Sequence, residues 1–204
     1  MKHWRLALYI AICMLAVVYG WTSAFAQSEW QDAADEHAEQ IADDTEQEDN
    51  PAWERYAFEL DYIDGSGTLT FAEIARDSKP FILFFWLTEC PLCHLQLPQV
   101  QQLKNTVDDE EIDLRIVSVN VDFGDKDALE FYLEKEMTFE LLHDSRARGT
   151  DEAYHLNELG CPLVYVFDEH GEFVDYLTGY RAHLEKTVFN LLDIATANST
   201  RTAR

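Results

Sequence analysis

Basic residues are scarce in this chain of 204 residues. Lysine and arginine together number 15, against 39 aspartates and glutamates, and the formal net charge is −24 at pH 7. A surface of this sign repels phosphate backbones and anionic lipid headgroups. The composition therefore argues against nucleic acid and anionic membrane surfaces as partners.

Cysteine is also scarce, with four in the whole chain: Cys13, Cys90, Cys93 and Cys161. Cys13 lies in an N-terminal apolar run, which leaves three for the remainder. Small exported domains that depend on disulfides carry more cysteines, in even number. One close pair and a lone thiol instead indicate redox or metal chemistry.

The N-terminal apolar run, Leu6 to Tyr19, is shorter than the roughly 20 residues that span a bilayer. Lys2 and Arg5 precede this run, and the sequence Ala24-Phe25-Ala26 follows it. These parts are typical of a secretory signal peptide. We predict a signal peptide over residues 1–26 and a periplasmic or otherwise extracytoplasmic protein, with an uncleaved membrane anchor as the alternative.

A segment without any basic residue follows the signal peptide. Gln27 to Asn50 holds ten acidic residues and few apolar ones. Such a segment repels itself and cannot bury enough apolar surface to fold. We therefore predict a disordered acidic linker over residues 27–52 and a folded domain over residues 53–204.

The folded part is expected to be an α/β domain organised around Phe81 to Leu87, a run of seven apolar residues that predicts a strand buried on both faces. A helix is expected after it, carrying Leu95, Val100, Leu103 and Val107 on its apolar positions. Further strands are predicted at residues 114–121, 139–142, 163–167 and 173–177, and further helices at residues 125–137, 150–156 and 184–195. The order predicts parallel crossovers followed by an antiparallel edge.

The domain is expected to open with a β-hairpin, formed by residues 56–63 and 68–71 around an Asp-Gly-Ser-Gly turn. The alternative is a calcium-binding loop over Tyr62 to Glu73, with Asp64 and Glu73 as ligands. Tyr62 stands at its first ligand position and supplies no carboxylate, and Pro80 leaves little room for an exit helix. The hairpin is favoured.

Two cysteines stand where the central strand passes into a helix, in the sequence Cys90-Pro91-Leu92-Cys93. Proline favours the first helical position, so Cys90 is expected to be the N-cap, where the positive end of the helix dipole stabilises a thiolate. Cys90 is then the attacking sulfur and Cys93 resolves the mixed disulfide. Pro98 is expected to kink the helix.

A single C-x-x-C can also supply half of a zinc site. A second C-x-x-C, or a Cys/His pair at ligand spacing, is missing from the sequence. The strand before the motif and the helix after it favour redox chemistry.

Trp86, Cys90, Cys93 and Pro98 together resemble the active-site segment of the thioredoxin superfamily, and residues 160–180 resemble its cis-proline strand and closing hairpin. The first hairpin and the acidic end of the strand at residues 143–144 are similar to exported TlpA/ResA-like thiol-disulfide oxidoreductases. The resemblance implies a thioredoxin-like fold, a mixed central sheet flanked by helices with an extra N-terminal β-hairpin. It also implies that Cys90 is the nucleophile, that Cys93 is the resolving thiol, and that Trp86, Cys161 and the cis-proline Pro162 bind substrate.

The sequence departs from that family at the expected proton acceptor. Phe84 stands where thioredoxins have a buried aspartate, and Gln96 where ResA-like proteins have a glutamate. His94 is the nearest candidate base, but the residue directly after Cys93 points to a different helix face, and a solvated histidine is favoured.

Cys161 stands before the proline where the family usually has Thr, Val or Ile. It is interpreted as a small buried thiol. The alternative is that Cys90, Cys93 and Cys161 converge, and bind Cu(I) or Zn(II) or form a second disulfide. The Pro-Leu pair between the first two cysteines leaves the direction of electron flow open.

The sequence thus predicts an extracytoplasmic thiol-disulfide oxidoreductase that exchanges disulfides with exported proteins and needs no bound cofactor. Its relatives draw electrons from DsbD/CcdA-like membrane donors, and cytochrome c maturation or disulfide reduction are the processes the resemblance implies. A monomer is expected. The alternative is a metal-binding protein or metallochaperone that uses Cys90, Cys93 and Cys161.

Overall fold

A central strand with two buried faces organises the structure. The computed structural model describes residues 53–194. In it β3 (Phe81–Trp86) is buried along its whole length. Its odd-numbered residues pack into one apolar cluster and its even-numbered residues into another. Because side chains alternate along a strand, this run of large apolar residues needs a layer of helices on each face.

β3 belongs to a seven-stranded mixed sheet with the order β2-β1-β5-β4-β3-β6-β7. The strands β3, β4 and β5 are parallel, whereas β6 and β7 run antiparallel at one edge and the β1–β2 hairpin extends the sheet at the other. The bounds of the other strands are β1 (Glu59–Tyr62), β2 (Thr68–Thr70), β4 (Arg115–Asn120), β5 (Glu140–His143), β6 (Leu163–Phe167) and β7 (Phe173–Thr178). The predicted parallel centre and antiparallel edge are confirmed.

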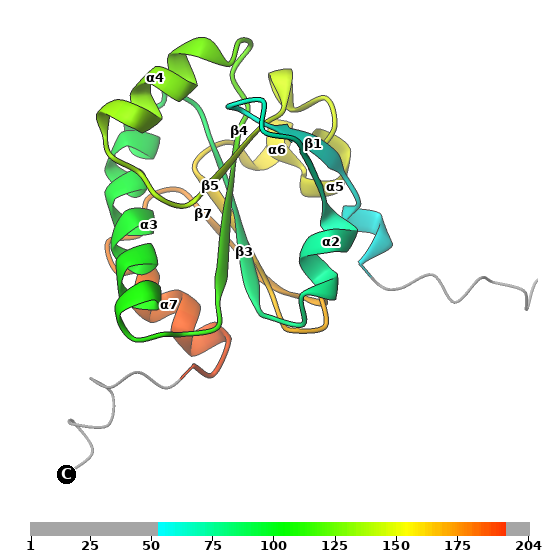
Figure 1. Ribbon diagram of the computed structural model, residues 1–204, viewed down its shortest axis with the longest axis vertical. Coiled ribbons are helices and arrows are strands. Elements are labelled where there is room, and N and C mark those ends of the chain that lie inside the picture. The colour runs from blue at the N-terminus through cyan, green and yellow to red at the C-terminus, as the bar shows by residue number, and fades with distance from the viewer. Residues whose placement is uncertain (1–52, 195–204) are drawn as a thin grey trace, which may run out of the picture. The chain divides into compact units, whose positions relative to one another are not determined.

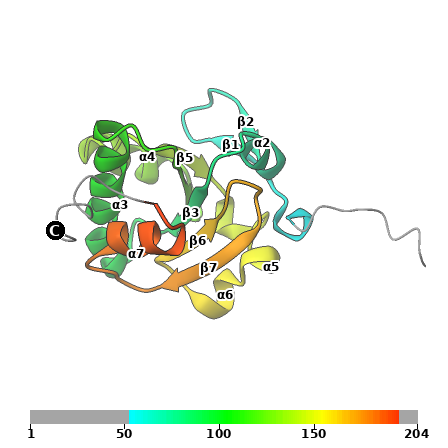
Figure 2. The same cartoon turned by 90° about the horizontal axis from the view of Figure 1, so that it is seen from below.

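Helices cover both faces of the sheet (Figures 1 and 2). One layer consists of α3 (Pro91–Asp109), α4 (Lys126–Glu134) and α7 (Leu184–Leu191). The other consists of α2 (Phe71–Arg76), α5 (Asp151–Tyr154) and α6 (Leu156–Leu159), with the 3-10 turn η1 (Glu54–Tyr56) beside them. A second 3-10 turn, η2 (Ser145–Ala147), follows β5. The predicted mixed central sheet flanked by helices is therefore present.

The helix α2 is a correction to the sequence interpretation, which expected little room for a helix before Pro80 and a strand through residue 71. Thr70 ends β2 and caps α2: its Oγ1 accepts the Glu73 N–H at 3.2 Å, and the Glu73 carboxylate accepts the Thr70 N–H at 2.8 Å. This capping box stabilises a helix of only six residues. Glu73 is thereby occupied, and Asp64 accepts the Ser66 N–H at 2.9 Å, so both ligands of the alternative calcium loop bond to neighbouring protein groups.

Other helices also differ from expectation. The helix predicted at residues 150–156 is two short helices, because His155 adopts a left-handed conformation with φ 51°. Leu95, which we expected on an apolar position, is 55% exposed. In α4 the fully buried residue is Ala128.

The predicted signal peptide and acidic linker lie outside the residues that the structure describes. Between residues 53 and 194, no helix combines the length and the apolar character needed to cross a membrane.

Candidate active site

Cys90 lies at the point where β3 passes into α3. It is the N-cap of α3, and Pro91 is the first helical residue. The Cys90 Sγ accepts the Cys93 N–H at 3.2 Å, which satisfies one of the free N–H groups of the first helical turn. The predicted N-cap position is therefore confirmed, and the half-buried Cys90 sulfur lies at the positive end of a 19-residue helix.

Cys93 lies one turn further into α3 and is fully buried. Burial raises the pKa of its thiol, and its hydrogen bond with Cys90 and the charges of Cys90 and Cys161 act in the same direction, whereas a backbone hydrogen bond at Leu87 lowers it. The net effect is a strongly raised pKa. The two sulfurs thus differ as an exchange reaction requires, with a reachable one at the helix end and a protonated one beneath it.

Cys161 and Pro162 lie directly before β6 and face the start of α3. The Cys161–Pro162 peptide bond is cis, as the resemblance implied. The Cys90 Sγ donates to the Cys161 carbonyl oxygen at 3.5 Å. Pro162 is buried, and its carbonyl accepts the Gly179 N–H at 2.9 Å. The loop before β6 therefore forms the second wall of the site.

The Cys161 thiol is half-buried beside the other two. Burial raises its pKa to about 12, with further contributions from the charges of Cys90 and Asp122. All three cysteines are free thiols in this structure. Among the described residues, no group of three or more His, Cys, Asp or Glu side chains has an arrangement that could hold a metal ion.

Trp86 requires a correction as a substrate-binding residue. As the last residue of β3 it points to the α3 side of the sheet, where its indole is fully buried and lies 5.9 Å from the Phe131 ring. A side chain without exposed surface cannot contact a protein substrate. Trp86 instead supports the core behind Cys93.

Asp122 is a site residue that the sequence interpretation missed. It follows β4, the strand next to β3. Its carboxylate accepts hydrogen bonds from the Thr88 N–H at 3.1 Å, the Thr88 hydroxyl at 2.7 Å and the Asn120 side-chain amide at 2.9 Å. Parallel strands place their carboxyl ends at the same edge of a sheet. The position of Asp122 directly after the strand predicted at residues 114–121 could therefore have indicated that it lies near Cys90. The bonds fix the turn that delivers Cys90.

A groove of about 530 Å³ adjoins Cys90 on this side. Its walls come from the turn before α3 and from the loop between β4 and α4, which presents Phe123 with 70% of its surface exposed. Exposed apolar surface also occurs at Leu92, within the cysteine motif, and at Leu95. The surface around Cys90 is therefore partly apolar.

His94 is exposed, as predicted, but its ring has partners. It stacks on Phe131 with a centroid distance of 4.9 Å, and its Nε2 is hydrogen-bonded to the Thr88 carbonyl oxygen. His94 therefore joins α3, α4 and the turn before Cys90. Pro98 lies inside α3, where its predicted kink stays a prediction.

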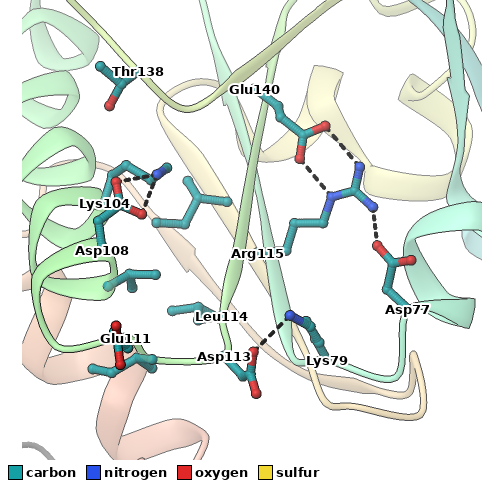
Figure 3. A pocket seen from close by; sticks show the side chains of 13 residues that line it. Asp77, Lys79, Lys104, Asp108, Glu111, Asp113, Leu114, Arg115, Thr138 and Glu140 are labelled. Atoms are coloured by element: carbon teal, nitrogen blue, oxygen red, sulfur yellow. Dashed lines mark hydrogen bonds and ion pairs between the residues drawn. The ribbon is translucent and has the colours of Figure 1, made fainter.

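A second pocket lies at the opposite end of the sheet (Figure 3). The three cations that line it are paired: Lys79 with Asp113, Lys104 with Asp108, and Arg115 with Asp77 and Glu140. The Arg115 pairs join the start of β4 to the start of β5 and to the end of α2, whereas Lys104 and Asp108 pair within α3. Because each cation already has a partner within the protein, these side chains are explained by their role in stability. The thiols lie at the other end of the sheet, at the carboxyl ends of the parallel strands.

The fold and the cysteine arrangement define a thioredoxin-like α/β protein with a C-x-x-C at the start of its long helix. A sequence profile of the AhpC/TSA family matches residues 54–176, and the chain belongs to this family. The solved structure of a secreted Mycobacterium tuberculosis disulfide oxidoreductase homologous to E. coli DsbE superimposes with a TM-score of 0.56 at 17% identity, covering 67% of this chain and 98% of that one. The predicted thioredoxin-like fold is thereby confirmed.

Two relatives from Bacillus subtilis (strain 168) are similar in sequence. The thioredoxin-like protein YneN is 28% identical over 104 residues, or 50% of this chain and 57% of that protein. Sporulation thiol-disulfide oxidoreductase A is 29% identical over 100 residues, or 48% of this chain and 59% of that protein. The matches thus span less than two thirds of either relative.

Proposed function

We propose that this protein is an extracytoplasmic thiol-disulfide oxidoreductase that exchanges disulfides with protein substrates through Cys90 and Cys93. The observation that carries the proposal is the placement of Cys90 as the N-cap of α3, with Cys93 buried one turn later. The name of one B. subtilis relative, a thiol-disulfide oxidoreductase, supports it.

In the reducing direction, the Cys90 thiolate attacks one sulfur of a substrate disulfide. A bond forms between Cys90 and that sulfur, and the other substrate sulfur leaves as a thiolate and takes up a proton. Cys93 then loses its proton and attacks the Cys90 sulfur, which forms the Cys90–Cys93 disulfide and releases the second substrate thiolate. The second substrate thiolate also takes up a proton, so the substrate gains two electrons and two protons. The two cysteines supply the electrons, and the protons of their thiols go to solvent. The oxidising direction is the reverse, and no bound cofactor is needed.

The substrate chain is proposed to lie along Cys161. The Pro162 carbonyl already accepts the Gly179 N–H, so the backbone edge at Cys161 is the part of this wall next to Cys90. The exposed Phe123 and Leu92 would contact residues on either side of the substrate cysteine. Exported protein thiols or disulfides, including those of apocytochrome c, are the proposed substrate class.

The proposal extends to the whole chain. The basic start, apolar run and Ala-Phe-Ala sequence support export by a signal peptide at residues 1–26, or a retained anchor, and residues 27–52 are proposed as the linker to the folded domain. A DsbD/CcdA-like membrane protein is the proposed electron donor if the protein reduces its substrates. A monomer suffices for the exchange.

Trapping with a Cys93→Ser variant tests this function. Without Cys93 the mixed disulfide on Cys90 cannot be resolved, so the variant should accumulate covalent adducts with exported proteins that a reductant releases. Cys90→Ser is the matched control and should form no adducts. If Cys93→Ser forms none either, and the wild type binds stoichiometric metal, the oxidoreductase proposal fails in favour of a metal-binding protein.

A further inference from the structure

Gln96 is a fully buried amide on α3, three residues after Cys93. Its Oε1 accepts the Arg181 N–H at 2.6 Å. Because a backbone N–H can only donate, this bond fixes which end of the amide is the oxygen. The other end, Nε2, is buried and has no hydrogen-bond partner among the residues that the structure describes. A buried donor without an acceptor costs free energy, so such groups need an explanation.

The register of α3 places this amide beside the turn that holds Cys93. Residues three apart share a helix face, and helical side chains lean toward the helix N-terminus. Gln96 and Cys93 therefore share one face of α3, and in the reduced protein the Gln96 Nε2 makes no hydrogen bond to the Cys93 sulfur. Both are fully buried, so bulk water does not solvate a charge that forms on Cys93.

We propose that the Gln96 amide is the hydrogen-bond donor reserved for the Cys93 thiolate, which exists only while a mixed disulfide is being resolved. The inference rests on the proposed function and deepens it. The Gln96 Nε2–H stabilises the negative sulfur while the Cys93 proton goes to solvent. Cys93 then bonds to the Cys90 sulfur, and the substrate sulfur leaves with the electron pair of the broken bond.

A neutral donor suits this position because of the groups that surround Cys93. Burial disfavours its ionised form most strongly, and the titratable groups that act on it in residues 53–194 are Cys90 and Cys161. In the mixed disulfide Cys90 carries no charge, and the Cys161 thiol is protonated at neutral pH because its pKa is about 12. A hydrogen bond to an ionised group is among the stronger ones available in a core. The amide can therefore stabilise the thiolate without a second buried charge.

The experiment uses an aromatic disulfide, dithiobis(nitrobenzoate), as substrate and follows the release of coloured thionitrobenzoate by stopped flow. Attack by Cys90 releases one equivalent, and resolution by Cys93 releases the second. All proteins carry Cys161→Ser, so that no third thiol contributes. Gln96→Met removes both amide functions at similar volume, whereas Gln96→Glu keeps the acceptor for Arg181 and removes the donor. Gln102→Met, on an exposed position of the same helix, is the matched control.

The expected result is a slower second phase in both Gln96 variants, by about tenfold at neutral pH, with its pH midpoint about one unit higher. The first phase and the Gln102→Met protein should match the reference. A second phase that is unchanged or faster in Gln96→Glu would overturn the inference, because a faster phase would mean that a base acts at this position.

The only other buried side-chain nitrogen without a partner in the described part is Trp86 Nε1, which lies in the same core cluster as Cys93. A slower second phase in Trp86→Phe, with none in the Gln96 variants, would assign the donor to the indole and overturn the inference. Failure of the proposed function gives a different result: the reference protein itself would release one equivalent and form no Cys90–Cys93 disulfide.

Discussion

Three cysteines within one site have different surroundings, and their reactivity is expected to differ accordingly. Cys90 caps a helix at the rim, Cys93 is fully buried, and burial raises the pKa of Cys161 to about 12. At pH 8 a thiol with that pKa is ionised to about one part in ten thousand. Proximity alone therefore does not make Cys161 a nucleophile.

We predict that iodoacetamide at pH 8 alkylates Cys90 in the reduced native protein, while Cys161 stays below a few per cent. Peptide mapping by mass spectrometry measures the extent at each site. In denaturant all three thiols should react at similar rates, which controls for differences in their intrinsic reactivity. Alkylation of native Cys161 as fast as Cys90 would contradict the raised pKa.

At the residue scale, the sequence located the two cysteines at the start of α3 but not the groups that surround them. Cys90 and Cys93 were predictable because a C-x-x-C between a buried strand and a helix is a local pattern. The contacts of Asp122 and Gln96 join residues 34 and 85 positions apart. Trp86 was wrongly assigned to the substrate surface because a motif does not show which face of the sheet a strand residue meets.

At the element scale, the turn between β3 and α3 depends on a carboxylate from the neighbouring strand. Asp122 accepts both the N–H and the hydroxyl of Thr88, two residues before Cys90. A hydrogen bond to a charged group contributes about 1.5–3 kcal/mol to stability, and its loss leaves the Thr88 N–H without this acceptor.

Asp122→Ala is therefore expected to lower the free energy of unfolding by about 2–3 kcal/mol in urea titrations. The first thionitrobenzoate phase should slow as well, because the turn positions Cys90. Asp127→Ala removes an exposed carboxylate from the same groove and should change stability by no more than about 0.5 kcal/mol. Equal effects of the two substitutions would show that Asp122 affects stability through its negative charge alone and not through its hydrogen bonds to Thr88.

Strands were predicted better than short helices, for a physical reason. The six residues of β3 are fully buried, so its apolar pattern is continuous, and the 19 residues of α3 show a clear helical period. The helices α5 and α6 have four residues each, too few for a period, and His155 separates them by a left-handed backbone conformation. The helix α2 was missed although the spacing of Thr70 and Glu73, three residues apart, matches the capping-box pattern.

At the scale of the whole molecule, an ion-pair network joins the starts of the neighbouring strands β4 and β5 to the end of α2 (Figure 3). The Arg115 guanidinium bonds to both oxygens of Glu140 at 2.7 and 2.8 Å and also pairs with Asp77. Burial by itself would raise the pKa of Glu140, but hydrogen bonds from Arg115 and Tyr62 outweigh it and hold that pKa below the ordinary value of 4.5. Because the folded-state pKa is lowered, Glu140 stabilises the fold above about pH 4.5 and loses this contribution as the pH falls through its folded value.

We predict that Glu140→Gln lowers the free energy of unfolding by about 1–3 kcal/mol at pH 7. The difference from wild type should shrink as the pH is lowered from about 5 toward 3, because the wild-type carboxylate becomes protonated. Denaturant titrations across this range measure it, with the exposed Glu130→Gln as control. A difference that stays constant with pH would contradict the assigned pKa direction.

The central claim is that Cys90 and Cys93 form a reversible redox pair, and equilibration in glutathione redox buffers tests it most directly. After acid quenching, mass spectrometry counts the free thiols and locates the disulfide. The account predicts one reversible two-electron transition to a Cys90–Cys93 disulfide, with a potential between about −270 mV, as in thioredoxin, and about −120 mV, as in DsbA. A value near the first would indicate a reductase and a value near the second an oxidase. A Cys90 that retains glutathione while Cys93 stays reduced at every potential would contradict the account.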